Sequence, residues 1–173
     1  MKRNLAYLGY VLRHKLYVLQ GGLATGASIW RLLIHDWSKF LPSEWKPYST
    51  KYYNEDGTSR YIPRKKRDQL YDESEVLENF YEAFKLHYKR NKHHWHYWVY
   101  FKGIHGKDLD AMQMPDKYVA EMLADWYGTG KAKGRKGGWG EVREWYKQNK
   151  DSMILHPTTQ IYVEARLRVG GAI

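Results

Sequence analysis

The sequence predicts a mainly all-α fold, a compact helical bundle in which residues 95–112 could form a small β-hairpin. Apolar residues recur at spacings of three and four in several stretches, as they do on one face of a helix. Glycine and proline residues separate these stretches into segments of helical length. A chain of 173 residues, 43% of them hydrophobic, is long enough to bury one core. We therefore expect a single domain over residues 1–173.

Three helices are expected in the first third of the chain. Residues 4–20 carry an apolar stripe, which consists of Leu5, Leu8, Leu12, Leu16 and Leu19, widened by Val11 and Val18. The pair Gly21-Gly22 predicts a break after this helix. A second helix is expected over residues 27–40, ending near Pro42, and a short third helix lies around residues 45–53.

Residues 54–72 are expected to form an exposed basic excursion. A turn cluster at 54–59 precedes the tetrad Arg64-Lys65-Lys66-Arg67, which could contact phosphates or simply be solvated. A long helix is then expected from residue 72 or 74 to about residue 91. Its inward face consists of Val76, Leu77, Phe80, Phe84 and His87.

The second half of the chain mixes strand and helix signals. Residues 95–101 are aromatic and β-branched enough for a strand, and glycines at 103 and 106 could turn it into a hairpin. A helix is expected over residues 116–127, directly after Pro115. The six glycines of residues 128–140 predict a mobile loop, and two more helices are expected over 141–149 and 158–167.

Composition restricts the chemistry. The chain has no cysteine, so a metal could be held only by nitrogen and oxygen ligands. The formal net charge of +10 favours acidic partners such as nucleotides, nucleic acid or phosphorylated metabolites, although charge alone also serves solubility. No apolar run approaches the roughly 20 residues of a membrane span, and no signal peptide is apparent. We therefore expect a cytoplasmic protein that does not enter a membrane.

The most informative stretch is His35-Asp36-Trp37-Ser38-Lys39-Phe40. A histidine and an aspartate follow directly on apolar residues, where an ionisable pair is costly unless it is paired or bound to a metal. On a continuous helix, Lys39 would project from the same face as His35, one turn further on. We interpret this hexapeptide as half of a metal site.

Other ionisable side chains lie on apolar helix faces. His14 flanks the stripe of the first helix, His87 lies on the inward face of its helix, and His94 would share that face if the helix continued. Each could instead be a hydrogen-bonded core histidine. Asp125 shares a face with Tyr118 and Met122, so it points with the apolar side chains toward a metal or toward an ordinary salt bridge. Together these residues suit Mn, Fe, Zn, Ni or Mg, and a helical bundle builds metal sites in this way.

The order of these motifs resembles the HD-domain superfamily of metal-dependent phosphohydrolases. The hexapeptide at residues 35–40 looks like its His-Asp-x-x-Lys form, and Ala124-Asp125-Trp126 resembles its later Ala-Asp motif. More closely, the chain resembles a family of small uncharacterised proteins frequent in phage and bacterial genomes, over roughly residues 5–167. The further motifs that carry this resemblance are Arg90-Asn91-x-His93-His94-Trp95, Met114-Pro115, Glu121-Met122-Leu123-Ala124-Asp125-Trp126 and Leu155-His156-Pro157.

The superfamily resemblance implies a set of ligands. One metal would be held by His14, His35, Asp36 and Asp125. A second would use His87 and either His93 or His94, whose close spacing to His87 departs from the superfamily pattern. The cofactor would thus be one or two divalent ions, in a protein of a bacterial cell or a phage-infected host.

The resemblance further implies hydrolysis of a phosphoester, with a nucleotide or a related phosphorylated compound as the substrate. Asp36 would bridge the metals or orient the nucleophile, and Lys39 would contact a substrate phosphate or a bridging water. Arg90 would help to recruit an anionic substrate, and Glu121 would fix a ligand histidine or relay a proton. Two alternatives stay open. The same residue types suit an HD-type di-iron oxygenase, and the positive charge suits a non-enzymatic binder of nucleic acid or protein with a structural metal. The oligomeric state cannot be predicted.

Overall fold

The computed structural model describes residues 1–60, 74–135 and 138–170. Within them the chain is mainly helical, with seven α-helices and one two-stranded antiparallel sheet, which confirms the predicted fold class. The chain divides into two compact units. Unit 1 consists of Met1–Leu12 and Asp36–Arg90, and unit 2 of Arg13–His35 and Asn91–Ile173. The basic tetrad at 64–67, and with it most of the expected excursion, lies outside the described residues.

Helix α1 (Lys2–Ala24) is longer than predicted, because its two glycines do not end it. A Cβ added at Gly22 would lie 2.3 Å from Leu32 Cδ2, and one at Gly21 would lie 2.8 Å from Tyr127 Cδ1. Each glycine therefore lets a neighbouring side chain pack directly against the helix backbone. The helical conformation costs these residues entropy, which this packing offsets.

The buried face of α1 is not the leucine stripe. Tyr7, Val11, His14 and Val18 are fully buried, whereas Leu12 is 54% exposed and Leu16 is 62% exposed. The buried set has the spacing of four, three and four residues that one helix face requires. His14 thus occupies the centre of the buried face, whereas the prediction placed it on the flank of the apolar stripe.

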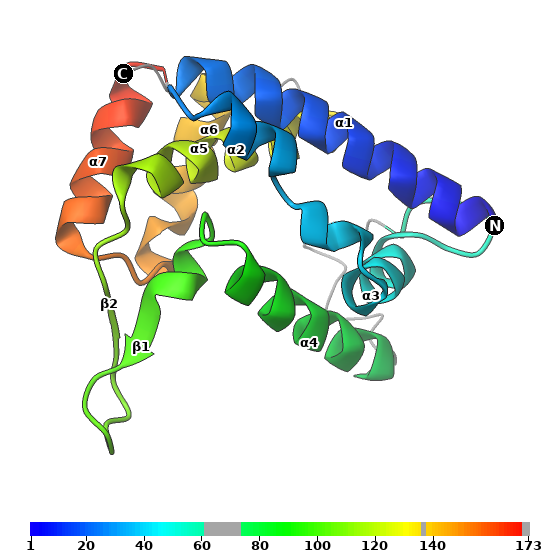
Figure 1. The fold of residues 1–173 in the computed structure, drawn as a ribbon, viewed down its shortest axis with the longest axis horizontal. Helices are drawn as coiled ribbons and strands as arrows, with labels where there is room; N and C mark the ends of the chain where they lie inside the picture. The colour runs from blue at the N-terminus through cyan, green and yellow to red at the C-terminus, as the bar shows by residue number, and fades with distance from the viewer. Residues whose placement is uncertain (61–73, 136–137, 171–173) are drawn as a thin grey trace. The chain divides into compact units, whose positions relative to one another are not determined.

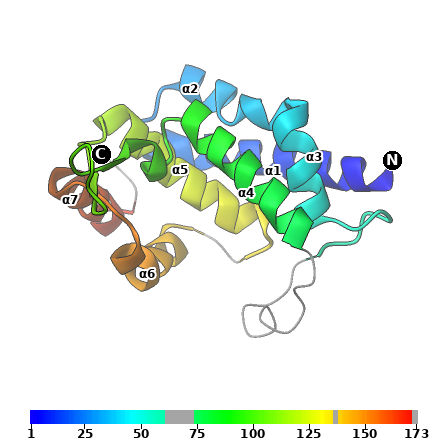
Figure 2. The ribbon, with the colours of Figure 1, turned by 90° about the horizontal axis from the view of Figure 1, so that it is seen from below.

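Unit 1 is built on α3 (Pro42–Tyr52) and α4 (Ser74–Arg90), which lie side by side (Figure 2). Its core is aromatic and includes Tyr7, Val11, Tyr48 and Ala83, with Phe80 and Phe84 of the predicted inward face packed against them. His87 is also buried, one turn after Ala83, as the periodicity predicts.

Unit 2 contains α2 (Ile29–Ile34), α5 (Asp116–Ala132), α6 (Trp139–Asn149) and α7 (Pro157–Arg168) (Figure 1). Helix α5 continues through residues 128–132, so the predicted loop begins too early. The reason is close packing, since a Cβ at Gly128 would lie 2.5 Å from Val18 Cγ2 and 2.8 Å from the Val18 amide nitrogen. Most of the buried side chains of α5 pack into the core clusters of this unit.

A β-hairpin in unit 2 confirms the prediction for residues 95–112. Strands β1 (Val99–Phe101) and β2 (Leu109–Ala111) pair antiparallel, with Val99 opposite Ala111. Residues 95–98 form a 3₁₀ turn rather than the start of the strand. The hairpin extends away from α5, α6 and α7 (Figure 1). In the part of the chain that the structure describes, no helix is long and apolar enough to cross a membrane.

Candidate metal centre

The His35-Asp36 pair lies at a break between two helical segments. The predicted helix over 27–40 is wrong in this respect, because α2 ends at Ile34 and a 3₁₀ turn covers Trp37–Phe40. Asp36 has φ 53°, a left-handed conformation that aspartate tolerates better than most residues but that no α-helix can contain. Strain of this kind is concentrated at functional sites.

The break also changes the environment of Lys39. Its backbone N–H donates to the Asp36 carbonyl oxygen at 3.0 Å, and its Nζ lies 2.6 Å from Asp36 Oδ2. Both side chains are nearly buried, so the ion pair offsets the desolvation of each charge. Lys39 is therefore a direct ion-pair partner of the Asp36 carboxylate. The prediction that Lys39 projects from the same helix face as His35 does not apply, because no continuous helix joins the two residues.

Within unit 2, three polar side chains from three helical segments converge on one point. His14 comes from α1, His35 directly follows α2, and Asp125 comes from α5. His14 Nε2 lies 3.4 Å from His35 Nε2 and 3.2 Å from Asp125 Oδ1, and His35 Nε2 lies 3.6 Å from the same oxygen. All three residues are buried. They form a triangle of donor atoms that we call the triad.

The dimensions of the triad suit a metal ion. Zinc-like ions bind nitrogen and oxygen ligands at about 2.0–2.2 Å, which sets tetrahedral donor atoms roughly 3.3–3.6 Å apart. The three observed separations cover nearly the same range. Two imidazole nitrogens and one carboxylate oxygen are also a donor set that Zn, Mn and Fe accept.

Glu121 fixes the orientation of His35. Glu121 Oε1 lies 3.2 Å from His35 Nδ1 and 3.2 Å from His93 Nδ1, while its Oε2 accepts from Arg31 Nη1 at 3.3 Å. An ionised carboxylate can only accept, so both Nδ1 atoms carry the proton. In the neutral ring, Nε2 of His35 then presents its lone pair to the other two members of the triad. Carboxylate–histidine pairs of this kind orient the ligands of metal sites.

Electrostatics keep both acidic groups ionised. Burial by itself would raise the pKa of Glu121, but hydrogen bonds from His35 and His93 lower that pKa to about 2. Burial opposes ionisation of Asp125 too, and His14 and His35 nevertheless hold its pKa well below the usual range of an aspartate. The unit therefore contains two buried anionic groups, each stabilised by histidines.

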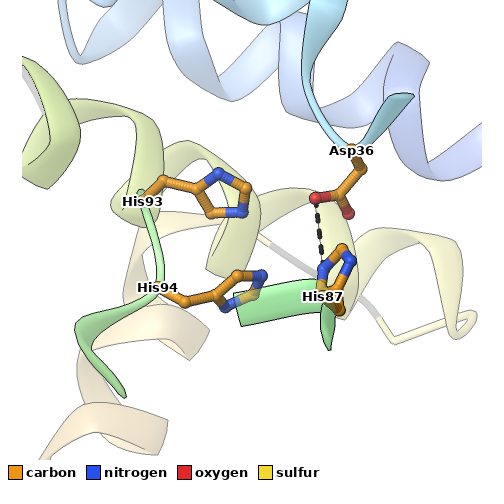
Figure 3. A group of neighbouring side chains, drawn as sticks. All are labelled: Asp36, His87, His93 and His94. Atoms are coloured by element: carbon orange, nitrogen blue, oxygen red, sulfur yellow. Dashed lines mark ion pairs between the residues drawn. The ribbon is translucent and has the colours of Figure 1, made fainter. Parts of the chain in front are cut away.

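Unit 1 contains a second carboxylate–histidine arrangement. His87 Nε2 lies 3.3 Å from Asp36 Oδ1, the ion pair that is dashed in Figure 3. The other ring nitrogen, Nδ1, lies 2.7 Å from Glu44 Oε2. Glu44 also accepts from Ser38 Oγ at 3.0 Å and from Arg90 Nη1 at 2.7 Å. The ring of His87 is thus held by Glu44 in the same way as the ring of His35 is held by Glu121.

These contacts shift the ionisation of both groups. Burial disfavours charge on each, but Asp36 and Glu44 raise the pKa of His87, and His87 and Arg90 lower the pKa of Glu44. Glu44 is a residue that the sequence did not reveal, because an acidic residue in the first turn of a helix is common and suits the helix dipole. Within unit 1, the positive charge of Arg90 is paired with the negative charge of Glu44.

His93 and His94 belong to unit 2, and Figure 3 shows their rings one above the other. Their ring centroids lie 4.2 Å apart, and the His93 ring lies 4.3 Å from that of His35. His93 is buried and contacts Glu121, whereas His94 is half-buried and lines a pocket. That either histidine shares a second metal with His87 stays a prediction.

A pocket of about 370 Å³ in unit 2 reaches the triad at Asp125. Much of its lining is aromatic, with Trp95, Trp126 and Trp145 among the residues that form it. Lys133 and Arg135 also line it, and Arg135 is paired with Glu141 at 3.4 Å. A small molecule in this pocket would lie beside Asp125, one of the three residues of the triad.

The site and fold together define a mainly helical protein whose buried histidine, aspartate and glutamate side chains could hold a metal ion. The chain belongs to a family of unknown function, DUF5662, whose model matches residues 3–169. No curated protein and no solved structure shows significant similarity to it. The family membership names neither a metal nor a reaction, so an assignment of function depends on the chemistry of the site.

Proposed function

We propose that this protein is a metal-dependent phosphohydrolase of the HD type, acting on a phosphoester. The observation that carries the proposal is the triad, in which two Nε2 atoms and one carboxylate oxygen face one another at separations of 3.2–3.6 Å. Three protein ligands leave coordination positions open for water and substrate, as in catalytic zinc sites. The net charge of +10 favours an anionic substrate.

Asp36 and His87 are proposed as further ligands, as the HD resemblance implies. Asp36 is joined to His35 by a peptide bond, and His87 presents Nε2 to the Asp36 carboxylate. Either His93 or His94 is proposed to complete a second metal site. Glu44 and Glu121 would act as positioning residues, since each holds Nδ1 of a ligand histidine.

A divalent ion at such a site supplies Lewis-acid chemistry, because it polarises a phosphoryl oxygen and lowers the pKa of water. In the reaction a water oxygen bonds to phosphorus while the bond to the ester oxygen breaks. For a phosphomonoester, the leaving alkoxide takes up the proton that the attacking water loses, and the products are an alcohol and inorganic phosphate. Lys39, which lies against Asp36, would balance negative charge as it develops on the phosphoryl oxygens.

Metal content and phosphate release together test the proposal. Protein purified without chelator is analysed for bound metal, and 4-nitrophenyl phosphate is offered as substrate with added Mn²⁺, Zn²⁺ or Mg²⁺. We expect at least one ion per chain, and the loss of both metal and activity in Asp125→Asn and His14→Gln. The matched controls are Asp108→Asn and His105→Gln, which change exposed residues of the hairpin loop.

The proposal is wrong if Asp125→Asn and His14→Gln bind as much metal as the controls do. It is equally wrong if the metal-loaded wild type hydrolyses no phosphoester in a panel of nucleotides, cyclic nucleotides and sugar phosphates. Phosphate release detects hydrolysis of the monoesters, and chromatography detects the nucleoside monophosphate formed from a cyclic nucleotide.

A second candidate is an iron-dependent oxygenase, which the donor set of the triad specifically favours. Two histidines and one carboxylate with open positions are also the ligands of non-haem Fe(II) oxygenases. Protein loaded anaerobically with Fe²⁺ would then react with oxygen and show an optical change that Mn²⁺ does not produce. Phosphate release with Mn²⁺ under anaerobic conditions would exclude this candidate.

A further inference from the structure

The pocket beside the triad has a floor formed by one face of α5. Asp125, Thr129 and Lys133 follow one another at intervals of four residues, so they form a line along this helix. At a rise of about 1.5 Å per residue, the line from Asp125 to Lys133 is roughly 12 Å long. The pocket therefore runs from the metal-binding triad to a lysine at the end of the helix.

The walls of the pocket are aromatic. Trp126 of α5 and Trp145 of α6 meet edge to face, with ring centroids 5.0 Å apart and an interplanar angle of 61°. Trp95 and Met153 also line the pocket, and none of these four side chains is fully buried. Indole faces and a methionine sulfur favour a flat, polarisable ring over a flexible chain.

Gly130 leaves the floor open between the carboxylate and the lysine. Glycine is unfavourable inside a helix, and at Gly128 close packing against Val18 explains its presence. At Gly130 the nearest atom to an added Cβ would be Glu141 Oε1 at 3.9 Å, which is an ordinary contact. Packing therefore does not require glycine at this position, but a longer side chain there would enter the pocket.

The size of the pocket restricts its occupant. A volume of about 370 Å³ is near the lower end of the roughly 300–1000 Å³ that small-molecule sites have. It suits a compact molecule and is too small for several units of a polymer.

We propose that this pocket binds the planar aromatic group of a phosphomonoester, so that the substrates are compact ring-bearing phosphomonoesters. This inference rests on the proposed function, since the phosphoryl group would lie at the triad while the ring contacts Trp126 and Trp145. Hydrolysis would break the bond between phosphorus and the ester oxygen, form a bond from phosphorus to the water oxygen, and release a ring-bearing alcohol or phenol with inorganic phosphate.

Binding of the dephosphorylated ring tests the pocket without metal or catalysis. Isothermal titration measures the Kd of 1-naphthol for the full chain, with hexan-1-ol as an apolar ligand that lacks a ring. We expect 1-naphthol to bind at least tenfold more tightly than hexan-1-ol. Gly130→Met should raise the Kd of 1-naphthol at least tenfold, because the new side chain occupies the floor of the pocket. Gly140→Met, in an exposed helical position with no atom within 4 Å of its Cβ, should leave the Kd within twofold.

A second pair of variants covers the case in which Gly130→Met does not fold, which thermal unfolding would reveal. Trp145→Leu should raise the Kd of 1-naphthol at least tenfold. Trp139→Leu is its control, because it changes a tryptophan of the same helix that does not line the pocket. The inference is overturned if hexan-1-ol binds as tightly as 1-naphthol. It is also overturned if the pocket variants that fold keep the Kd of the wild type.

Failure of this inference differs from failure of the proposed function. Phosphate release that is as efficient from hexyl phosphate as from 1-naphthyl phosphate, with no binding of 1-naphthol, would leave a phosphohydrolase without a ring pocket. Ring binding that follows the variants as expected, without phosphate release from any ester, would support the pocket and refute the phosphohydrolase.

Discussion

Glu121 offers a sharp test of the triad, because its carboxylate contacts His35 without being a member of the triad itself. Its carboxylate contacts His35, His93 and Arg31 at 3.2–3.3 Å. Replacing it with glutamine keeps the shape and one acceptor oxygen, but removes the charge that makes His35 a stronger donor. Loss of such a partner weakens metal binding by about 10- to 100-fold, which is roughly 1.4–2.7 kcal/mol.

Two variants should divide this range. Glu121→Gln should weaken metal binding about tenfold, since an acceptor for Nδ1 of His35 remains. Glu121→Ala should weaken metal binding about 100-fold or more, because it leaves His35, His93 and Arg31 without the carboxylate that accepts their hydrogen bonds. The dissociation constant of Mn²⁺ or Zn²⁺ is measured by competition with a chromophoric chelator.

Glu164→Gln is the matched control, since Glu164 is a half-buried carboxylate of unit 2 whose contacts among the described residues are with Tyr146, Gln160 and Lys150. It should leave the metal affinity within twofold of the wild type. Equal affinities for Glu121→Ala, Glu164→Gln and the wild type, in folded proteins, would refute the role of Glu121 in orienting His35.

Three further predictions concern stability. Gly128→Ala should lower the free energy of unfolding by about 1–3 kcal/mol or more, since its Cβ would lie 2.5 Å from Val18 Cγ2; denaturant titration measures this, and an unchanged midpoint would contradict the close packing. The stability that the low pKa of Glu121 contributes is complete above pH 4.5 and is lost as the pH falls toward about 2. The free energy of unfolding of Glu121→Gln should therefore depend less on pH in this range than that of the wild type, which acid unfolding followed by circular dichroism measures. In chelator, Lys39→Met should cost about 3 kcal/mol, because it removes the ammonium that lies 2.6 Å from the buried Asp36 carboxylate. A thermal midpoint equal to that of the wild type would refute this.

Local patterns in the sequence predicted much of the fold. The helix over α4, with Phe80, Phe84 and His87 on its inward face, follows from spacing alone, because residues three or four apart share a face. The hairpin near residues 95–112 follows from β-branched and aromatic residues followed by glycines. The boundaries were less predictable at Gly21, Gly22 and Gly128, where glycine serves close packing inside a helix and not a turn.

Donor types and their order along the chain were also open to prediction. Without cysteine, a site had to use histidine and carboxylate, and His14, His35 and Asp125 were identified from their positions on apolar helix faces. Their convergence to 3.2–3.6 Å could not be read from the sequence, because it depends on how three helical segments pack.

The sequence by itself thus determined the helical class and the residues able to bind a metal, because both follow from residue type and short-range spacing. The tertiary structure decided which face of α1 is buried, that the helix breaks at Asp36, and that Glu44 holds His87. It also decided that an aromatic pocket reaches Asp125. These features depend on contacts between residues distant in the chain, which local periodicity does not encode.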